Sequence, residues 1–128
     1  SCTRLVLEIT ETAVISNLIE VKEFLAQVQE LGVNIALDDF GSGMASFRYL
    51  QSLPLNYLKI DGQFISGLLD DELARATVQS FIDVAGVIDV PTVAEHVENE
   101  RVASTLVEMG VHFLQGFYLG RPEPTVNG

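Results

Sequence analysis

The chain has 128 residues, of which 48% are hydrophobic and 20% charged, a balance typical of one soluble globular domain or part of one. Its formal net charge of −11 argues against a nonspecific binder of nucleic acid polymers, because affinity for phosphate backbones comes from Lys and Arg. The single cysteine excludes an internal disulfide, and no apolar stretch reaches the roughly 18 residues of a membrane span. We therefore expect a cytoplasmic segment without direct membrane contact, although other segments of a parent chain can still anchor it.

Five short apolar runs, each ending in polar residues, alternate with helical patterns along the chain. The runs are LVLEITE (5–11), VNIALDD (33–39), YLKID (57–61), PTVAEHVE (91–98) and VHFLQG (111–116). Near-continuous hydrophobicity over so few residues is typical of strands buried on both faces of a parallel sheet. Apolar residues at three-to-four spacing predict helices over about 17–31, 71–85 and 98–109, with shorter helical turns near 45–50 and 63–68.

Alternating strands and helices predict an α/β fold with a parallel sheet and right-handed crossovers. In a β/α barrel the carboxyl ends of such strands form one face, where the loops build the active site. The predicted strand ends carry polar or charged residues, namely Glu8, Asp38 with Asp39, Lys59 with Asp61, Glu95 and Gln115. Among the remaining residues, Phe24, Phe47, Phe64 and Phe81 are expected in the core, and His112 in the core or the barrel wall.

The adjacent pair Asp38 and Asp39 needs a local explanation. In a continuing strand consecutive side chains point to opposite faces, so both acids can serve one site only if the strand stops there. Gly41 and Gly43 follow at once and allow a tight turn. The plainer interpretation is a solvated strand end with a side-chain-stabilised turn.

Carboxylates gathered on one rim repel each other unless protons or cations compensate them. Such a hard, all-oxygen ligand set favours Mg²⁺ or Mn²⁺, and one Asp bridging two ions would make a two-metal hydrolytic centre. Lys59 could orient or help deprotonate an attacking water, with Asp61 on the same side of the strand to hold its ammonium. Taken singly, Lys59 and Asp61 are also compatible with a structural ion pair, and Glu95 with a charge at a helix N-terminus.

Five ordered motifs resemble those of the EAL domain, the bacterial cyclic di-GMP phosphodiesterase. They are EITE (8–11), DDFGSG (38–43), KID (59–61), AEHVE (94–98) and QGFYLGRP (115–122). The resemblance implies a TIM-type barrel enzyme that hydrolyses cyclic di-GMP to pGpG with two Mg²⁺ or Mn²⁺ ions.

The same resemblance implies a role for each matching residue. Glu8 and Asp38 correspond to ligands of the first metal, Asp38 and Asp39 bridge to the second, and Glu95 completes that second site. Lys59 corresponds to the lysine that contacts the catalytic water, Asp61 lies beside it, and Gln115 supports the site. Glu11 corresponds to a residue that steadies the loop after DDFG, where Ser42 replaces the commoner threonine and keeps its hydroxyl.

The chain also departs from the family pattern. The Glu-Ala-Leu segment and a later Asn-containing strand, which supply first-metal ligands in the family, are absent, and His96 stands where the family usually has glycine. A complete barrel needs roughly 250 residues. We therefore expect residues 1–128 to be the C-terminal portion of one EAL domain, a partial (β/α)8 barrel of about five units with an incomplete first metal site.

Three functions remain open at this point. The first is an enzyme whose isolated fragment is weak or inactive, with open sheet edges that a homodimer would cover. The second is a cyclic di-GMP receptor without catalysis, and the third a structural or regulatory piece. Other signalling domains are expected elsewhere in the parent chain.

Overall fold

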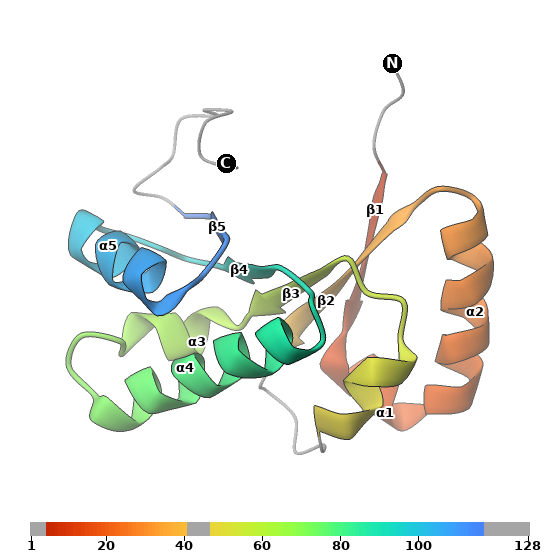
Figure 1. The fold of residues 1–128 in the computed structure, drawn as a ribbon, viewed down its shortest axis with the longest axis horizontal. Helices are drawn as coiled ribbons and strands as arrows, with labels where there is room; N and C mark the ends of the chain where they lie inside the picture. Colours follow the sequence, from red (N-terminus) through yellow and green to blue (C-terminus); the bar gives the residue numbers. More distant parts are fainter. Residues whose placement is uncertain (1–4, 41–46, 117–128) are drawn as a thin grey trace.

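The computed structural model describes residues 5–40 and 47–116, which form one five-stranded sheet with helices between the strands (Figure 1). The strands are β1 (Val6–Thr10), β2 (Asn34–Phe40), β3 (Tyr57–Ile60), β4 (Thr92–Ala94) and β5 (Phe113–Leu114). Their spatial order follows the chain, and every neighbouring pair is parallel. The predicted α/β arrangement of about five parallel units is confirmed.

Helices connect the successive strands. They are α1 (Glu11–Ser16), α2 (Leu18–Glu30), the 3-10 helix η1 (Phe47–Ser52), α3 (Gly62–Ser66), α4 (Glu72–Val87) and α5 (Glu100–Met109). The helices predicted over 17–31, 71–85 and 98–109 correspond to α2, α4 and α5. Within the described ranges, no helix combines the length and the hydrophobicity needed to cross a bilayer.

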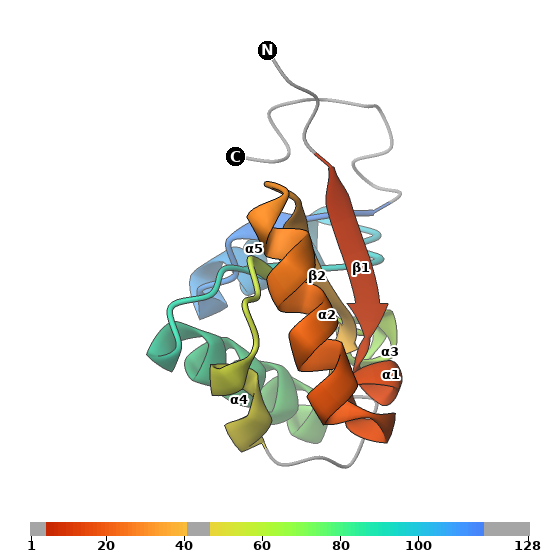
Figure 2. The ribbon, with the colours of Figure 1, turned by 90° about the vertical axis from the view of Figure 1, so that its right-hand side faces the viewer.

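The core lies between the sheet and the long helices. Helices α2, α4 and α5 lie on the same side of β1 (Figure 2). Fully buried strand residues on that side are Ile35, Leu37, Leu58 and Ile60, and they share one cluster with Leu25 of α2, Val78 of α4 and Leu106 of α5. Because side chains alternate along a strand, the residues between these positions belong to the other face of the sheet. Glu8, Asp38 and Lys59 occupy that other face.

Two expectations from the sequence were wrong, and one helix was not predicted. The first strand ends at Thr10, whose hydroxyl accepts a hydrogen bond from the Ala13 amide and so starts the unpredicted helix α1. Phe24 is 51% exposed, because the adjacent Leu25 holds the core position on α2. His112 is exposed as well, and its Nδ1 accepts a hydrogen bond from the Thr92 amide.

Candidate metal centre

Strand β2 does not stop at the two acids, as the sequence led us to expect, but continues to Phe40, and an irregularity within it brings the two consecutive carboxylates to one site. The pairing of β2 with β3 changes register between Leu37 and Phe40, and Asp39 adopts a left-handed backbone with φ of 55°. The Asp38 carboxylate accepts a hydrogen bond of 2.9 Å from the Asp39 amide, which stabilises this turn. Such an irregularity cancels the alternation of side chains, so Asp38 and Asp39 need not point to opposite faces.

Glu95, directly after β4, completes an acidic group with these two residues. One carboxylate oxygen from each of Asp38, Asp39 and Glu95 lies within 4.8 Å of the others. All three side chains are partly buried, and they come from the carboxyl ends of two strands that flank β3. The sheet therefore brings together three of the four acids that the sequence proposed as metal ligands.

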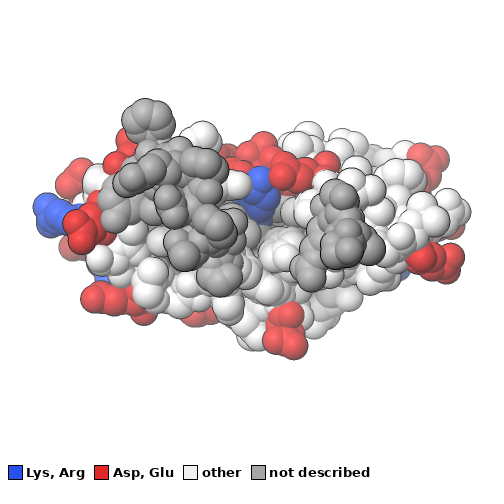
Figure 3. All heavy atoms as spheres, turned by 90° about the horizontal axis from the view of Figure 1, so that it is seen from above, with Lys and Arg blue, Asp and Glu red and all other residues white. Residues whose placement is uncertain are grey.

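The fourth acid, Glu8, joins the group through a lysine. The Lys59 ammonium lies 3.0 Å from a Glu8 carboxylate oxygen and 3.0 Å from one of Glu95. Lys59 is only 9% exposed, because β3 is the central strand and both neighbours shield it. Seen from above, acidic atoms gather beside a basic group near the centre of the molecule (Figure 3). The site thus consists of carboxylates arranged around one buried cation.

The pKa values of the group reflect this crowding. Burial, followed by repulsion from Asp38, raises the pKa of Asp39. Burial also raises the pKa of Glu95 and outweighs the opposing effect of the Lys59 ammonium. For Lys59, burial alone would lower the pKa, but the hydrogen bonds to Glu8 and Glu95 overcome it and raise the pKa. Without metal, the raised pKa values of Lys59, Asp39 and Glu95 therefore favour the protonated form of each of these three groups.

The remaining predicted residues lie around this group. Asp61 caps α3, because its carboxylate accepts hydrogen bonds of 3.1 Å from the backbone amide and the side-chain amide of Gln63. Among the described residues, the Lys59 ammonium forms ion pairs with Glu8 and Glu95, and the expected ion pair with Asp61 is not formed. Gln115 contributes its backbone, donating to the Ala94 carbonyl and accepting from the Val97 amide, while its side chain is exposed.

Glu11 is a buried acid that the site does not use directly. It is 1% exposed at the start of α1, and it accepts a hydrogen bond of 2.5 Å from the Tyr49 hydroxyl. Burial and then this hydrogen bond raise the pKa of Tyr49, so the phenol keeps its proton. No sequence pattern indicates this role of Tyr49, because 38 residues separate the two partners. Ser42 lies outside the described residues.

The donor set fits a hard divalent cation. Asp38, Asp39 and Glu95 offer oxygen atoms only, which Mg²⁺ and Mn²⁺ accept readily. A bound cation would offset both the burial and the repulsion from Asp38 that raise the pKa of Asp39, so ionisation of this acid and binding of the metal would favour each other. The plainer interpretations of each acid, taken singly, do not account for three carboxylates that converge from the ends of two strands.

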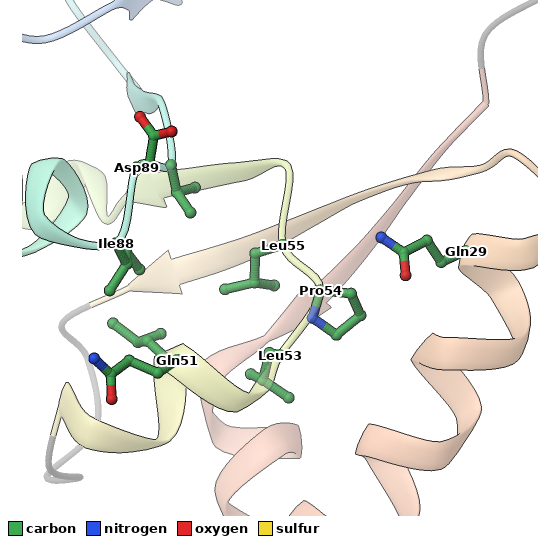
Figure 4. Close-up of a pocket in the computed structure, with 9 residues that line it drawn as sticks. Gln29, Gln51, Leu53, Pro54, Leu55, Ile88 and Asp89 are labelled. Carbon is green, nitrogen blue, oxygen red and sulfur yellow. The ribbon is translucent and has the colours of Figure 1, made fainter.

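A hollow of about 300 Å³ lies at the opposite end of the strands (Figure 4). It is lined by the end of α2 and by the segments that precede β3 and β4, including Gln29, Leu53, Leu55 and Ile88. The short helix η1 contributes Leu50 and Gln51 to the lining. Of the described residues lining the hollow, Asp89 alone is ionisable, so this end does not compete with the acidic group as a metal site.

Comparison with known proteins agrees with the fold and the acidic group. The family model described as the EAL domain matches residues 1–122. The cyclic di-GMP phosphodiesterase PdeB of Shewanella oneidensis is 46% identical over 117 residues, which is 91% of this chain and 14% of that protein. The cyclic di-GMP phosphodiesterase PdeA of Borreliella burgdorferi is 36% identical, over 92% of this chain and 18% of its own length. The chain belongs to the EAL domain family.

Solved structures of this family have the same arrangement of elements, and the family has a TIM-barrel fold. The structure titled PaMucR phosphodiesterase in complex with c-di-GMP superposes with a TM-score of 0.88 at 39% identity and covers 94% of this chain. The EAL domain of Mycobacterium smegmatis DcpA superposes with a TM-score of 0.83 at 38% identity. The present chain spans 49% and 55% of those two chains, respectively.

Proposed function

We propose that this chain is part of a phosphodiesterase domain that hydrolyses one ester bond of cyclic di-GMP to give pGpG, with Mg²⁺ or Mn²⁺ as cofactor. The observation that carries the proposal is the group of Asp38, Asp39 and Glu95, whose carboxylate oxygens lie within 4.8 Å of one another beside buried Lys59. Relatives named cyclic di-GMP phosphodiesterases, at 36–46% identity, supply the substrate class.

Each residue of the group has a chemical task. Asp38, Asp39 and Glu95 would hold the cations, and Glu8 would join as a further ligand of the first metal. When bound, the metal supplies Lewis acidity toward a phosphoryl oxygen and acidifies water. Hydrogen bonds to Glu8 and Glu95 raise the pKa of Lys59 against the effect of burial, so its ammonium is suited to orient water or to neutralise developing negative charge by donating hydrogen bonds. Asp61 and Gln115 support the site through the α3 cap and the β4–β5 pairing.

We also propose that residues 1–128 are the C-terminal portion of an EAL domain. In support, the chain spans 49% and 55% of two solved relatives, and β1 and β5 are the outer strands of the described sheet. A preceding segment with a Glu-Ala-Leu motif would pair with β1 and complete the first metal site. The chain spans only 14–18% of several curated relatives, which supports further signalling domains in the parent chain. The isolated fragment is then weak or inactive, and a homodimer is one way to cover its edges.

The test is hydrolysis of cyclic di-GMP by the full natural polypeptide, freed of metal and then supplied with Mg²⁺ or Mn²⁺, with pGpG measured by chromatography. We expect Asp38→Asn and Glu95→Gln to lower the rate about hundredfold or more. Glu98→Gln is the matched control, because Glu98 is an exposed acid three positions beyond Glu95 and outside the acidic group. A protein that forms no pGpG with either metal would contradict the proposed activity.

Calorimetry with cyclic di-GMP separates the enzyme from a receptor. A receptor binds the nucleotide equally in EDTA and in Mg²⁺ and releases no pGpG. The proposed enzyme binds with metal and turns the nucleotide over. If Asp38→Asn and Glu95→Gln leave Mn²⁺ affinity unchanged, the acids are a solvated rim and the chain is a structural or regulatory piece.

A further inference from the structure

The chain makes a sharp turn directly after Glu95. In a regular parallel ladder, a residue whose amide donates to the Ala94 carbonyl accepts at its own carbonyl from the amide of residue 96. Here the Gln115 amide donates to Ala94 O at 2.9 Å, but its carbonyl accepts from the Val97 amide at 3.0 Å. One extra residue therefore lies between the two hydrogen bonds, which makes this segment of the chain a bulge.

His96 is the left-handed residue of this bulge. Its φ is 60°, in the left-handed region that residues other than glycine rarely adopt. Asp39, at the irregularity in β2, has a φ of 55°. Both carboxylate-bearing strand ends of the acidic group thus depend on a left-handed residue for their direction. Such conformations persist where the surrounding structure holds them.

The imidazole of His96 packs against one particular residue, Gly62. A Cβ built on Gly62, the first residue of α3, would lie 2.2 Å from Cδ2 and 2.8 Å from Cγ of His96. No side chain can occupy that space, so the ring packs directly against the bare backbone of Gly62. This contact joins the bulge after β4 to the N-terminus of α3.

We infer that His96 is a positioning residue for Glu95, which acts by packing its ring on Gly62 and so fixing the left-handed turn. The turn aims the Glu95 carboxylate toward Asp38, Asp39 and the Lys59 ammonium. Releasing the ring would let Glu95 leave the geometry that a shared cation requires. The inference rests on the metal site proposed above and adds two residues, His96 and Gly62, to it.

The test is a double-mutant cycle that measures Mn²⁺ affinity by calorimetry in the full natural polypeptide. Gly62→Ala displaces the ring, and His96→Gly removes it while keeping a residue that tolerates positive φ. We expect each to weaken Mn²⁺ binding about tenfold, the scale of residues that orient metal ligands. In the His96→Gly protein the added methyl group has room, so Gly62→Ala should weaken binding less than about twofold further.

Gly86→Ala is the matched control for the substitution itself. A Cβ at Gly86, in α4, would have nothing within 4 Å, so Mn²⁺ affinity should stay unchanged. Urea unfolding in EDTA is measured in parallel, since a merely structural contact would alter stability without altering Mn²⁺ affinity. If Gly62→Ala does not fold, His96→Gly still decides the matter, because unchanged affinity there contradicts the inference.

Other outcomes also oppose the inference and can be told apart. Additive losses in the double variant would show that His96 and Gly62 act independently. A large loss in His96→Gly with none in Gly62→Ala would make the imidazole a direct ligand. An unaltered protein that binds no Mn²⁺ would overturn the proposed metal site and this inference together, whereas normal binding with no response to the variants would overturn this inference alone.

Discussion

At the scale of single residues, the site depends on conformations that side-chain chemistry alone does not favour. Asp39 has a left-handed backbone, which costs conformational free energy. Its raised pKa shows that an ionised carboxylate is unfavourable at this buried position beside Asp38. A structural role would not require this crowding. The arrangement is understandable if a cation offsets the repulsion, so metal-free and metal-bound protein should respond to the same substitution in opposite directions.

Asp39→Asn provides the corresponding prediction. Because the pKa of Asp39 is raised by folding, its charge destabilises the metal-free fold at high pH, and this effect disappears below the ordinary value of 3.8. Asp39→Asn should therefore raise the free energy of unfolding in EDTA by roughly 0.5 kcal/mol near neutral pH, and by less as the pH falls toward that value. The measurement is urea unfolding as a function of pH.

Added Mn²⁺ should reverse the sign. The unaltered protein gains stability from the bound ion, whereas Asp39→Asn loses a ligand and gains less. Asp70→Asn, at an exposed acid outside the group, is the control and should show neither effect. Equal stabilisation of Asp39→Asn and the unaltered protein by Mn²⁺ would speak against Asp39 as a ligand.

At the scale of elements, two contacts position the strand ends. The Tyr49 hydroxyl on η1 donates to buried Glu11 on α1 and so links the helices that follow β1 and β2. Gly116 lies so close to the chain after β4 that a Cβ there would meet Val97 O at 2.1 Å and Val97 N at 2.4 Å. Each contact joins two residues that are distant in the sequence. Each one thereby fixes a segment that directly follows a strand of the sheet.

Tyr49→Phe tests the first contact. The substitution removes one donor from a buried carboxylate, which should cost about 1–3 kcal/mol in the free energy of unfolding. Tyr57→Phe is the matched control, since within the described part of the chain Tyr57 donates no hydrogen bond and packs edge-on against Phe113. Urea unfolding of both variants at neutral pH gives the comparison. Equal losses would mean that the hydrogen bond to Glu11 contributes nothing of its own.

Gly116→Ala tests the second contact. The new methyl group would overlap the Val97 backbone, so β5 must move away from β4, at a cost of about 1–3 kcal/mol or more. Gly86→Ala, inside helix α4 with open space around it, should instead stabilise the fold by up to about 1 kcal/mol. Opposite shifts in thermal midpoint are expected. A stabilised Gly116→Ala variant would contradict the close approach of the two segments.

At the scale of the whole molecule, the order of strands and helices could be predicted from the sequence, because buried parallel strands appear as short apolar runs. The placement of acids at strand ends followed from the same pattern. Side-chain partners could not be predicted, since Lys59 meets Glu8 across 51 residues and Tyr49 meets Glu11 across 38. Nor did any pattern indicate the left-handed turns at Asp39 and His96.

The central claim is that Asp38, Asp39 and Glu95 bind a shared divalent cation. Crystals of the full natural polypeptide grown with Mn²⁺ and measured for anomalous scattering test it most directly. We predict a strong manganese peak at about 2.0–2.2 Å from carboxylate oxygens of all three residues. Manganese bound elsewhere, or these carboxylates turned away from any common ion, would contradict it.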